Sequence, residues 1–280
     1  MKRWRKPLIC SLLLVAVAGT AMAQRRRWRD RSSEGDRRGV PEWEVNRDYP
    51  GDLFTFARIK YDSWSGGWGG GRWRTDWPDS DLNFSLRLHQ LTTLKVNPDP
   101  VILELTDPKL FDYPFIYIIE PGSLVFSQPE REALRRYCLN GGFLMIDDFW
   151  GDYAYENLRR ELAKVFPGRP AKEVPLEHEI FHCVYDLKEK PQIPALGNAY
   201  PLPDGRIKTW EDPRDGSDAS TPYYKAIEDD EGRIMVFICH NTDLGDGWER
   251  EGEDKWYFEE FSVKKAYPLG INIVTYAMTH

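Results

Sequence analysis

Two apolar runs in the sequence end in polar residues that can bind ligands or move protons. The first run, residues 143–146, is followed by Asp147 and Asp148. Paired carboxylates can bind a hard cation or serve as a general acid and base. They can also cap a helix or accept hydrogen bonds from loop amides, which is a purely structural role. Neighbouring side chains of a strand point to opposite faces, so both acids face one crevice only if the chain turns there.

The second run, residues 233–238, is followed by Cys239, His240 and Asn241, with Asp243 and Asp246 shortly after. A cysteine and a histidine are the nucleophile and base of thiol enzymes. Neighbours in a strand diverge, however, so a second histidine from elsewhere in the chain would be the better base. The run therefore allows a thiol enzyme and does not require one.

A third motif, residues 178–182, reads His-Glu-Ile-Phe-His. On a helix this pattern places His178 and His182 on one face and binds zinc, with Glu179 as general base. Here Pro175 and the β-branched and aromatic residues nearby disfavour a regular helix. A metal site at His178 and His182 is the expectation only if that helix forms.

Apolar periodicity predicts strands and helices that alternate along residues 53–166, which is the pattern of a parallel sheet covered on both faces. Strands are expected at 53–61, 101–105, 115–119 and 143–147, and helices at 79–94, 128–139 and 153–165. Residues 170–222 hold many Pro and Gly and predict a long irregular insertion. Two more strands at 223–240 and an apolar helix at 269–278 complete an α/β fold, three-layer and flavodoxin-like, with a mostly parallel sheet.

The ends of parallel strands meet at one edge of a sheet, where ligands bind. The sequence therefore predicts a polar crevice formed by residues that follow strand ends: Tyr61, Glu120, Asp147, Asp148, Cys239, His240, Asn241 and Asp243. Acids gathered there should raise the pKa of Asp147 or Asp148 unless a cation or an Arg compensates. The glycine-rich residues 65–71 leave the same edge and could fold over it.

The N-terminal residues predict export to the periplasm or the extracellular space. Basic residues precede an apolar stretch at 8–18, and Ala21-Met22-Ala23 fits a signal cleavage site. The apolar stretch is too short for a membrane anchor, and no later segment is apolar enough to span a bilayer. The expected organisation is a signal peptide at 1–23, an Arg-rich disordered linker at 24–50 and a single α/β domain at 51–280.

Charge is spread unevenly along the chain. Residues 25–38 hold seven Arg and three acids, whereas residues 39–280 carry 27 basic and 42 acidic side chains, a net charge of −15. A body this acidic repels nucleic acid, so nucleic acid is excluded as a partner. Cys138, Cys183 and Cys239 remain after signal cleavage, and their odd number and spacing predict neither a zinc ribbon nor a disulfide framework.

Several long motifs resemble one bacterial family, domain of unknown function 4159. The matching segments run in order over residues 53–280 and include 54–61, 75–84, 111–115, 141–151, 178–183, 239–248 and 270–280. The resemblance implies a fold like that of the class I glutamine-amidotransferase superfamily. It implies no established activity, since the Gly-x-Cys-x-Gly elbow and the His-x-Glu pair of the amidotransferases are both missing.

These patterns lead to one functional expectation and two rivals. We expect an exported cell-envelope domain that binds a small ligand or an envelope protein partner through the polar crevice. The first rival is a hydrolase that uses a divalent metal as cofactor, with ligands from Asp147, Asp148, His178, His182, His240 and Asp243. The second is a thiol enzyme built on Cys239. No nucleotide-binding loop or serine-hydrolase elbow is present to favour other chemistry.

Overall fold

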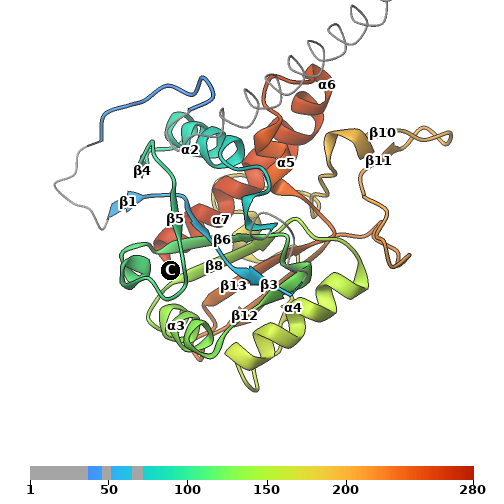
Figure 1. Ribbon diagram of the computed structural model, residues 1–280. Helices are drawn as coiled ribbons and strands as arrows, with labels where there is room; N and C mark the ends of the chain where they lie inside the picture. Colours follow the sequence, from blue (N-terminus) through green and yellow to red (C-terminus); the bar gives the residue numbers. More distant parts are fainter. Residues whose placement is uncertain (1–36, 46–51, 65–71) are drawn as a thin grey trace, which may run out of the picture. The chain divides into compact units, whose positions relative to one another are not determined.

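Five parallel strands make up most of a seven-stranded sheet in the computed structural model, which describes residues 37–45, 52–64 and 72–280 (Figure 1). In spatial order the strands are β5 (Val101–Leu103), β2 (Ala57–Ile59), β6 (Phe115–Ile119), β8 (Phe143–Asp147), β13 (Ile234–His240), β12 (Tyr223–Glu228) and β9 (Lys172–Glu173). Strands β5 to β13 pair in parallel. Strand β12 runs antiparallel to both β13 and β9, so the sheet is mixed. The prediction of a mostly parallel sheet is confirmed.

The central strands are apolar because both of their faces are covered. Every residue of β6, β8 and β13 is buried, as expected for parallel strands between two helical layers. Numbered along the chain, the five parallel strands stand in the order 2-1-3-4-5. The sheet changes its winding direction between β2 and β6, and such a point leaves a crevice outside the carboxyl ends of the strands.

Helices pack on both faces of this sheet (Figure 1). Their bounds are α2 (Asp79–Leu91), α3 (Gln128–Leu139), α4 (Gly151–Val165), α5 (Leu244–Glu249), α6 (Lys255–Tyr257), the π-helix η7 (Phe258–Ala266) and α7 (Tyr267–Thr279). Residues of α2 and α7 share one hydrophobic cluster with one face of the strands. Residues of α3 and α4 share a second cluster with the other face. No helix among the described residues combines the length and apolarity that a bilayer crossing requires.

The helix boundaries follow local signals in the sequence. Ser127 and Glu130 form a reciprocal capping box at the start of α3, which satisfies amides that a helix end leaves free. Helix α2 ends at Leu91, three residues before the expected end, where the Thr92 amide bonds the carbonyl oxygen of Leu88. The apolar C-terminal helix is longer than expected, because α6 and η7 extend it back to Lys255.

The first predicted strand, 53–61, is divided between two sheets, and the next two residues enter a third sheet. Strand β1 (Leu53–Phe54) pairs with β4 (Lys95–Val96), and β3 (Asp62–Ser63) pairs with β7 (Leu124–Val125). Only β2 enters the main sheet. The chain thus leaves the sheet directly after β2 and reaches the short 3₁₀ helix η2 (Arg72–Arg74) near the carboxyl edge. The expected loop at 65–71 lies outside the described residues.

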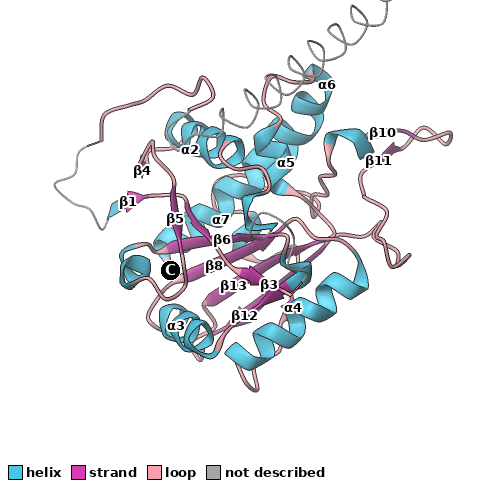
Figure 2. Ribbon diagram, in the orientation of Figure 1, coloured by secondary structure: helices cyan, strands magenta, loops and turns pink. Residues whose placement is uncertain are grey.

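The insertion at 170–222 is mostly loop (Figure 2). It contains the short 3₁₀ helices η5 (Glu179–Phe181) and η6 (Leu196–Asn198) and the hairpin of β10 (Tyr200–Pro201) and β11 (Ile207–Lys208). The remaining short 3₁₀ helices are η3 (Pro108–Asp112) and η4 (Pro121–Ser123).

Part of the expected linker at 24–50 belongs to the folded body. The signal segment at 1–23 lies outside the described residues, as do residues 24–36 and 46–51. Within the compact unit Val40–His280, Trp43 donates from Nε1 to the carbonyl oxygen of Val96 at 2.7 Å. Its ring stacks on His89 with a centroid distance of 4.7 Å. Trp43 is therefore a packing residue.

Candidate functional site

The end of strand β8 delivers a buried carboxylate to the carboxyl edge of the sheet. Asp147 is fully buried, and its Oδ2 accepts hydrogen bonds from the Tyr117 hydroxyl at 3.1 Å and the amides of Leu244 and Gly245 at 2.9 and 3.1 Å. Its other oxygen, Oδ1, has no hydrogen-bond partner among the described residues. Asp147 thus anchors the start of α5 and still presents a free oxygen.

The chain turns at the next residue. Asp148 has a positive φ of 55°, a left-handed conformation that Asp tolerates better than most residues. Its residue surface is 8% exposed, and its carboxylate forms no hydrogen bond or ion pair with the part of the chain that the structure describes. The turn is what allows both neighbouring acids to reach the same edge.

The loop after β13 supplies further acids. Asp243 caps α5 by accepting the Asp246 amide at 2.7 Å. Asp246 accepts the Leu196 amide at 3.2 Å and lies 3.5 Å from the Arg250 guanidinium. Both carboxylates are buried. Helix α5 therefore begins at the sheet edge with acids on its first turn.

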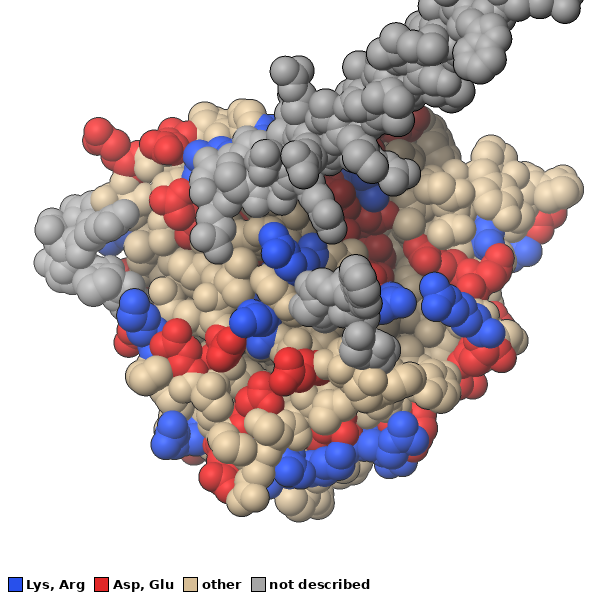
Figure 3. Space-filling view, in the orientation of Figure 1, with Lys and Arg blue, Asp and Glu red and all other residues tan. Residues whose placement is uncertain are grey.

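A fourth segment brings Asp76 to the same place. Oxygens of Asp76, Asp148 and Asp243 all lie within 4.8 Å of one another, and so do oxygens of Asp76, Asp246 and Glu249. We call the six residues Asp76, Asp147, Asp148, Asp243, Asp246 and Glu249 the carboxylate cluster. Figure 3 shows Asp and Glu side chains gathered in a hollow beside the β10–β11 hairpin.

Burial and mutual repulsion shift the protonation of these acids. Burial raises the pKa of Asp147 to about 7, and burial also raises the pKa of Asp246 to about 7. The pKa of Asp148 is raised by burial and then by the charges of Glu120 and Asp76. The pKa of Asp243 is raised by burial and then by Asp148 and Asp246. Without added positive charge, the cluster cannot hold all of its acids ionised at neutral pH.

Gly245 leaves the space in which the acids meet. A Cβ on this residue would lie 2.5 Å from Asp76 Oδ2, 3.2 Å from the Tyr117 hydroxyl and 3.3 Å from Asp243 Oδ1. Any side chain would therefore push the carboxylates apart. Glycine is required at position 245 because side-chain oxygens lie where a Cβ would be, and not because of its backbone conformation.

An open cavity of about 440 Å³ lies beside the cluster and shares Asp148 with it. Aromatic and charged side chains line it, chiefly Trp64, Trp150, Tyr153, Arg72, Arg214, Glu120, Glu211, Asp212 and Asp215. Lining residues come from the segments after β2, β6 and β8 and from the 170–222 insertion. The cavity is thus at the carboxyl edge, next to the change of winding direction.

Comparison with known proteins now gives a family. The family model described as "Domain of unknown function (DUF4159)" matches residues 55–278. The chain belongs to the DUF4159 family. The comparison with curated proteins gives no match.

The structure brings only some of the predicted crevice residues of this DUF4159 domain together. Asp147, Asp148 and Asp243 meet in the cluster. Glu120 lines the cavity and forms an ion pair with Arg72. Tyr61 supports the backbone at the end of β6, since its buried hydroxyl lies 2.7 Å from the carbonyl oxygens of both Ile119 and Glu120 and can donate to either.

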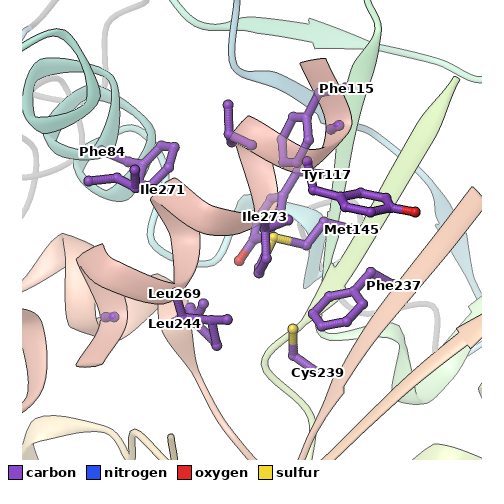
Figure 4. Packing of buried hydrophobic residues seen from close by; sticks show 14 of the residues in the cluster. Phe84, Phe115, Tyr117, Met145, Phe237, Cys239, Leu244, Leu269, Ile271 and Ile273 are labelled. Carbon is purple, nitrogen blue, oxygen red and sulfur yellow. The ribbon is translucent and has the colours of Figure 1, made fainter. Parts of the chain in front are cut away.

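Cys239 and His240 point to opposite faces of β13, because side chains alternate along a strand. Cys239 is buried in the hydrophobic cluster of α2 and α7, as Figure 4 shows. Burial raises the pKa of its thiol well above the ordinary value, which opposes formation of the thiolate. The expectation that Cys239 lies in the crevice is therefore corrected, and the Cys239–His240 pair does not form.

His240 and Asn241 have structural contacts on the other side. The His240 ring stacks on Phe149 and Tyr155 at 5.0 and 4.9 Å, and its Nε2 lies 3.1 Å from the carbonyl oxygen of Gly151. Asn241 accepts the Gly151 amide at 2.9 Å and donates to the carbonyl oxygen of Thr221 at 3.0 Å. Both residues fix the start of α4 and do not join the cluster.

The His178–His182 motif does not form the helix that a zinc site needs. Only the single 3₁₀ turn η5 forms there, and His178 caps it by accepting the Ile180 amide at 3.1 Å. The two ring nitrogens of His182 contact Asp186 and the carbonyl oxygen of Leu176, each at 2.7 Å. The metal site expected at these histidines is corrected: neither belongs to a metal-compatible group in the described part of the chain.

Asp76, Asp246 and Glu249 belong to the cluster but were not among the predicted crevice residues. Asp76 does not follow a strand, so strand-end reasoning overlooks it. A weak signal was available for Glu249, because it lies one helical turn beyond Asp246 in the run that follows β13. The three cysteines of the described residues, Cys138, Cys183 and Cys239, are free.

Proposed function

We propose that the DUF4159 domain binds a neutral, polyhydroxylated ligand, of the carbohydrate class, in the cavity at the carboxyl edge of the sheet. The observation that carries this proposal is the lining of the cavity, which combines four aromatic side chains with several carboxylates and two guanidinium groups. Sugar rings have apolar C–H faces that stack on aromatic side chains and hydroxyls that bond to carboxylates and Arg. Concave sites with aromatic walls and a few polar groups are the usual form of a small-molecule site.

Exposed and unpaired groups in the lining support this ligand class. The side chains of Trp64 and Tyr153 are 56% and 58% exposed, respectively. Trp150 Nε1 is buried without a hydrogen-bond partner among the described residues, and a ligand oxygen could accept from it. Acids outnumber Arg in the lining, which disfavours phosphate-bearing ligands.

The strand order 2-1-3-4-5 supports a flavodoxin-like fold. In that fold the ligand lies at the switch point of the sheet, where this cavity also lies. We do not extend amidotransferase chemistry to the domain, because Cys239 is in the hydrophobic core. We further propose that the N-terminal segment directs export to the cell envelope, where glycans or an envelope protein would be the partners.

Titration calorimetry with a panel of neutral and anionic oligosaccharides tests the proposal on the full chain. We expect saturable binding of a neutral sugar, weakened by about fivefold or more in Trp64→Ala and Tyr153→Ala, since each ring supplies about 1 kcal/mol or more. Tyr200→Ala is the matched control, because Tyr200 is exposed but does not line the cavity. No binding at about 1 mM sugar, or equal binding by all variants, would refute the proposal.

A hydrolase is the second candidate, and the position of Asp148 in the cavity lining favours it. Burial raises the pKa of this carboxyl group, and a carboxyl group with a raised pKa can serve as general acid or base. The histidines of the original hydrolase expectation do not contribute. Mass spectrometry of sugars incubated with the protein separates the two candidates, because hydrolysis adds one water across a glycosidic bond and binding leaves the mass unchanged.

A further inference from the structure

We propose that Asp76, Asp148 and Asp243 bind one hard divalent cation, of the Mg²⁺, Mn²⁺ or Ca²⁺ class. This site does not depend on the identity of the ligand in the cavity. Carboxylate oxygens are the preferred ligands of these cations, at metal–oxygen distances of about 2.0–2.6 Å. Two oxygens on opposite sides of such a cation are therefore about 4–5 Å apart. The three acids present oxygens within 4.8 Å of one another, which fits a single ion.

Unpartnered oxygens point to a missing positive group. The Asp148 carboxylate has no hydrogen bond within the described chain although the residue is only 8% exposed. Asp76 Oδ2 is buried with no donor among the described residues, and the side chain in contact with Asp76 is a second acid, Glu249. Buried polar atoms are almost always hydrogen-bonded, and a buried carboxylate without compensation is costly. A cation bound to these oxygens would satisfy both atoms.

Three Arg side chains near the cluster are already engaged, and Arg214, which lines the cavity, forms no ion pair with the cluster in the described chain. Arg58 pairs with Asp81, Arg72 with Glu120, and Arg250 with Asp246 and Glu249. Among the described residues, no ion pair compensates Asp76, Asp148 or Asp243, and a bound cation would supply the positive charge that lets them be ionised together.

Two features favour this trio over the neighbouring trio of Asp76, Asp246 and Glu249. Asp246 accepts the Leu196 amide and lies beside Arg250, so its charge is already partly compensated. Asp148 also lines the open cavity, which gives a cation a path from solvent. The absence of a side chain at Gly245 keeps the space next to Asp76 Oδ2 and Asp243 Oδ1 open.

Titration of the chelator-treated full chain with MnCl₂, followed by the electron paramagnetic resonance signal of free Mn²⁺, tests the site. We expect one Mn²⁺ per chain and a higher melting temperature in Mn²⁺, because a ligand that binds only the native state stabilises it. Asp148→Asn and Asp243→Asn should each weaken Mn²⁺ binding by about tenfold or more, since the number of charged ligands sets the affinity. Competition by MgCl₂ and CaCl₂ identifies the preferred ion.

Glu161→Gln is the matched control, since Glu161 is a buried acid on α4 that lies outside the cluster. It should bind Mn²⁺ as the parent chain does. Asp148→Asn keeps the side-chain shape and removes no hydrogen bond, and its melting curve reports whether it folds. The proposal is overturned if the parent chain binds no Mn²⁺ at about 1 mM or if folded Asp148→Asn binds as tightly as the parent. Loss of binding in Asp246→Asn alone would also overturn it, by moving the ion to the neighbouring trio.

Discussion

Arg58 and Asp81 form a fully buried ion pair that holds the loop bearing Asp76. Nε of Arg58 lies 3.0 Å from Asp81 Oδ2, and a second bond joins Nη2 to Oδ1. The same guanidinium donates to the carbonyl oxygens of Trp73 and Thr75 at 3.0 and 2.8 Å. The charge of Arg58, in the middle of strand β2, thus fixes the backbone next to Asp76. The position of Asp76 in the carboxylate cluster depends on this Arg.

Arg58→Lys should lower the free energy of unfolding by about 3–5 kcal/mol, because Lys cannot make the paired bonds and leaves Asp81 buried without them. Urea denaturation measures the change. Lys60→Met is the control, since Lys60 pairs with Glu104 on the surface and exposed pairs contribute at most about 1 kcal/mol. Equal losses in both variants would contradict the positioning role of Arg58.

Gly245→Ala should disrupt the cluster directly. The added Cβ would lie 2.5 Å from Asp76 Oδ2, so Asp76 must move, and we expect a loss of about 1–3 kcal/mol in stability. Mn²⁺ binding should weaken at the same time. Gly197→Ala is the control, because no heavy atom lies within 4 Å of a Cβ there. A Gly245→Ala variant that binds Mn²⁺ as tightly as the parent would show that the close contact of Asp76 with residue 245 does not matter for the site.

His240 should make stability fall in mild acid. Burial lowers the pKa of His240 from 6.5 to about 4. Above pH 6.5 the ring is neutral in both states, so its contribution is complete. Between pH 6.5 and about 4 the unfolded chain takes up a proton that the folded chain does not, which costs up to roughly 3 kcal/mol. Below about pH 4 both states are protonated and the loss stops.

The comparison of His240→Phe with the parent chain isolates this contribution. The buried acids of the cluster have raised pKa values and act in the opposite direction, because the folded state then binds the extra protons. Both chains contain these acids, so their contribution cancels when the free energy of unfolding of one chain is subtracted from that of the other. Urea denaturation at several pH values should show a gap that changes between pH 6.5 and about 4, whereas a constant gap would mean that His240 titrates normally in the folded protein.

Trp43→Ala should lower the free energy of unfolding by about 1–3 kcal/mol, through loss of ring burial and one hydrogen bond. A chain beginning at residue 51 should lose at least as much. Glu44→Ala, at an exposed neighbour, is the control and should change stability by less than about 0.5 kcal/mol. If the shortened chain has the same melting temperature as the parent, the segment around Trp43 contributes nothing to the stability of the fold.

Patterns among neighbouring residues in the sequence were enough to predict the buried strands, one helix start and the turn at the end of β8. The continuous apolar runs of β8 and β13 and the capping box of α3 are readable from neighbouring residues. The turn that brings Asp147 and Asp148 to one edge also lies where the apolar run ends. The alternation of side chains along β13 already separates Cys239 from His240 in principle, and the structure places them on opposite faces.

The rest of the site depends on contacts between distant segments. Asp76 is placed by Arg58, whose partner Asp81 lies 23 positions away, and nothing in the local pattern of β2 shows that this Arg is buried. The packing of Trp43 likewise depends on Val96, 53 positions away. A polar, Pro-containing stretch gives no local sign of such a contact.

The hydrogen bond between the Leu244 amide and Asp147 joins residues 97 positions apart, and this separation imposes an order on maturation. Asp147 and Asp148 are synthesised well before the loop and helix that bury them. Until the C-terminal part of the chain arrives, they are ordinary solvated acids with no shared cavity between them. Metal loading at the proposed site therefore follows completion of the chain, and a nascent or prematurely terminated polypeptide has no place to hold the ion.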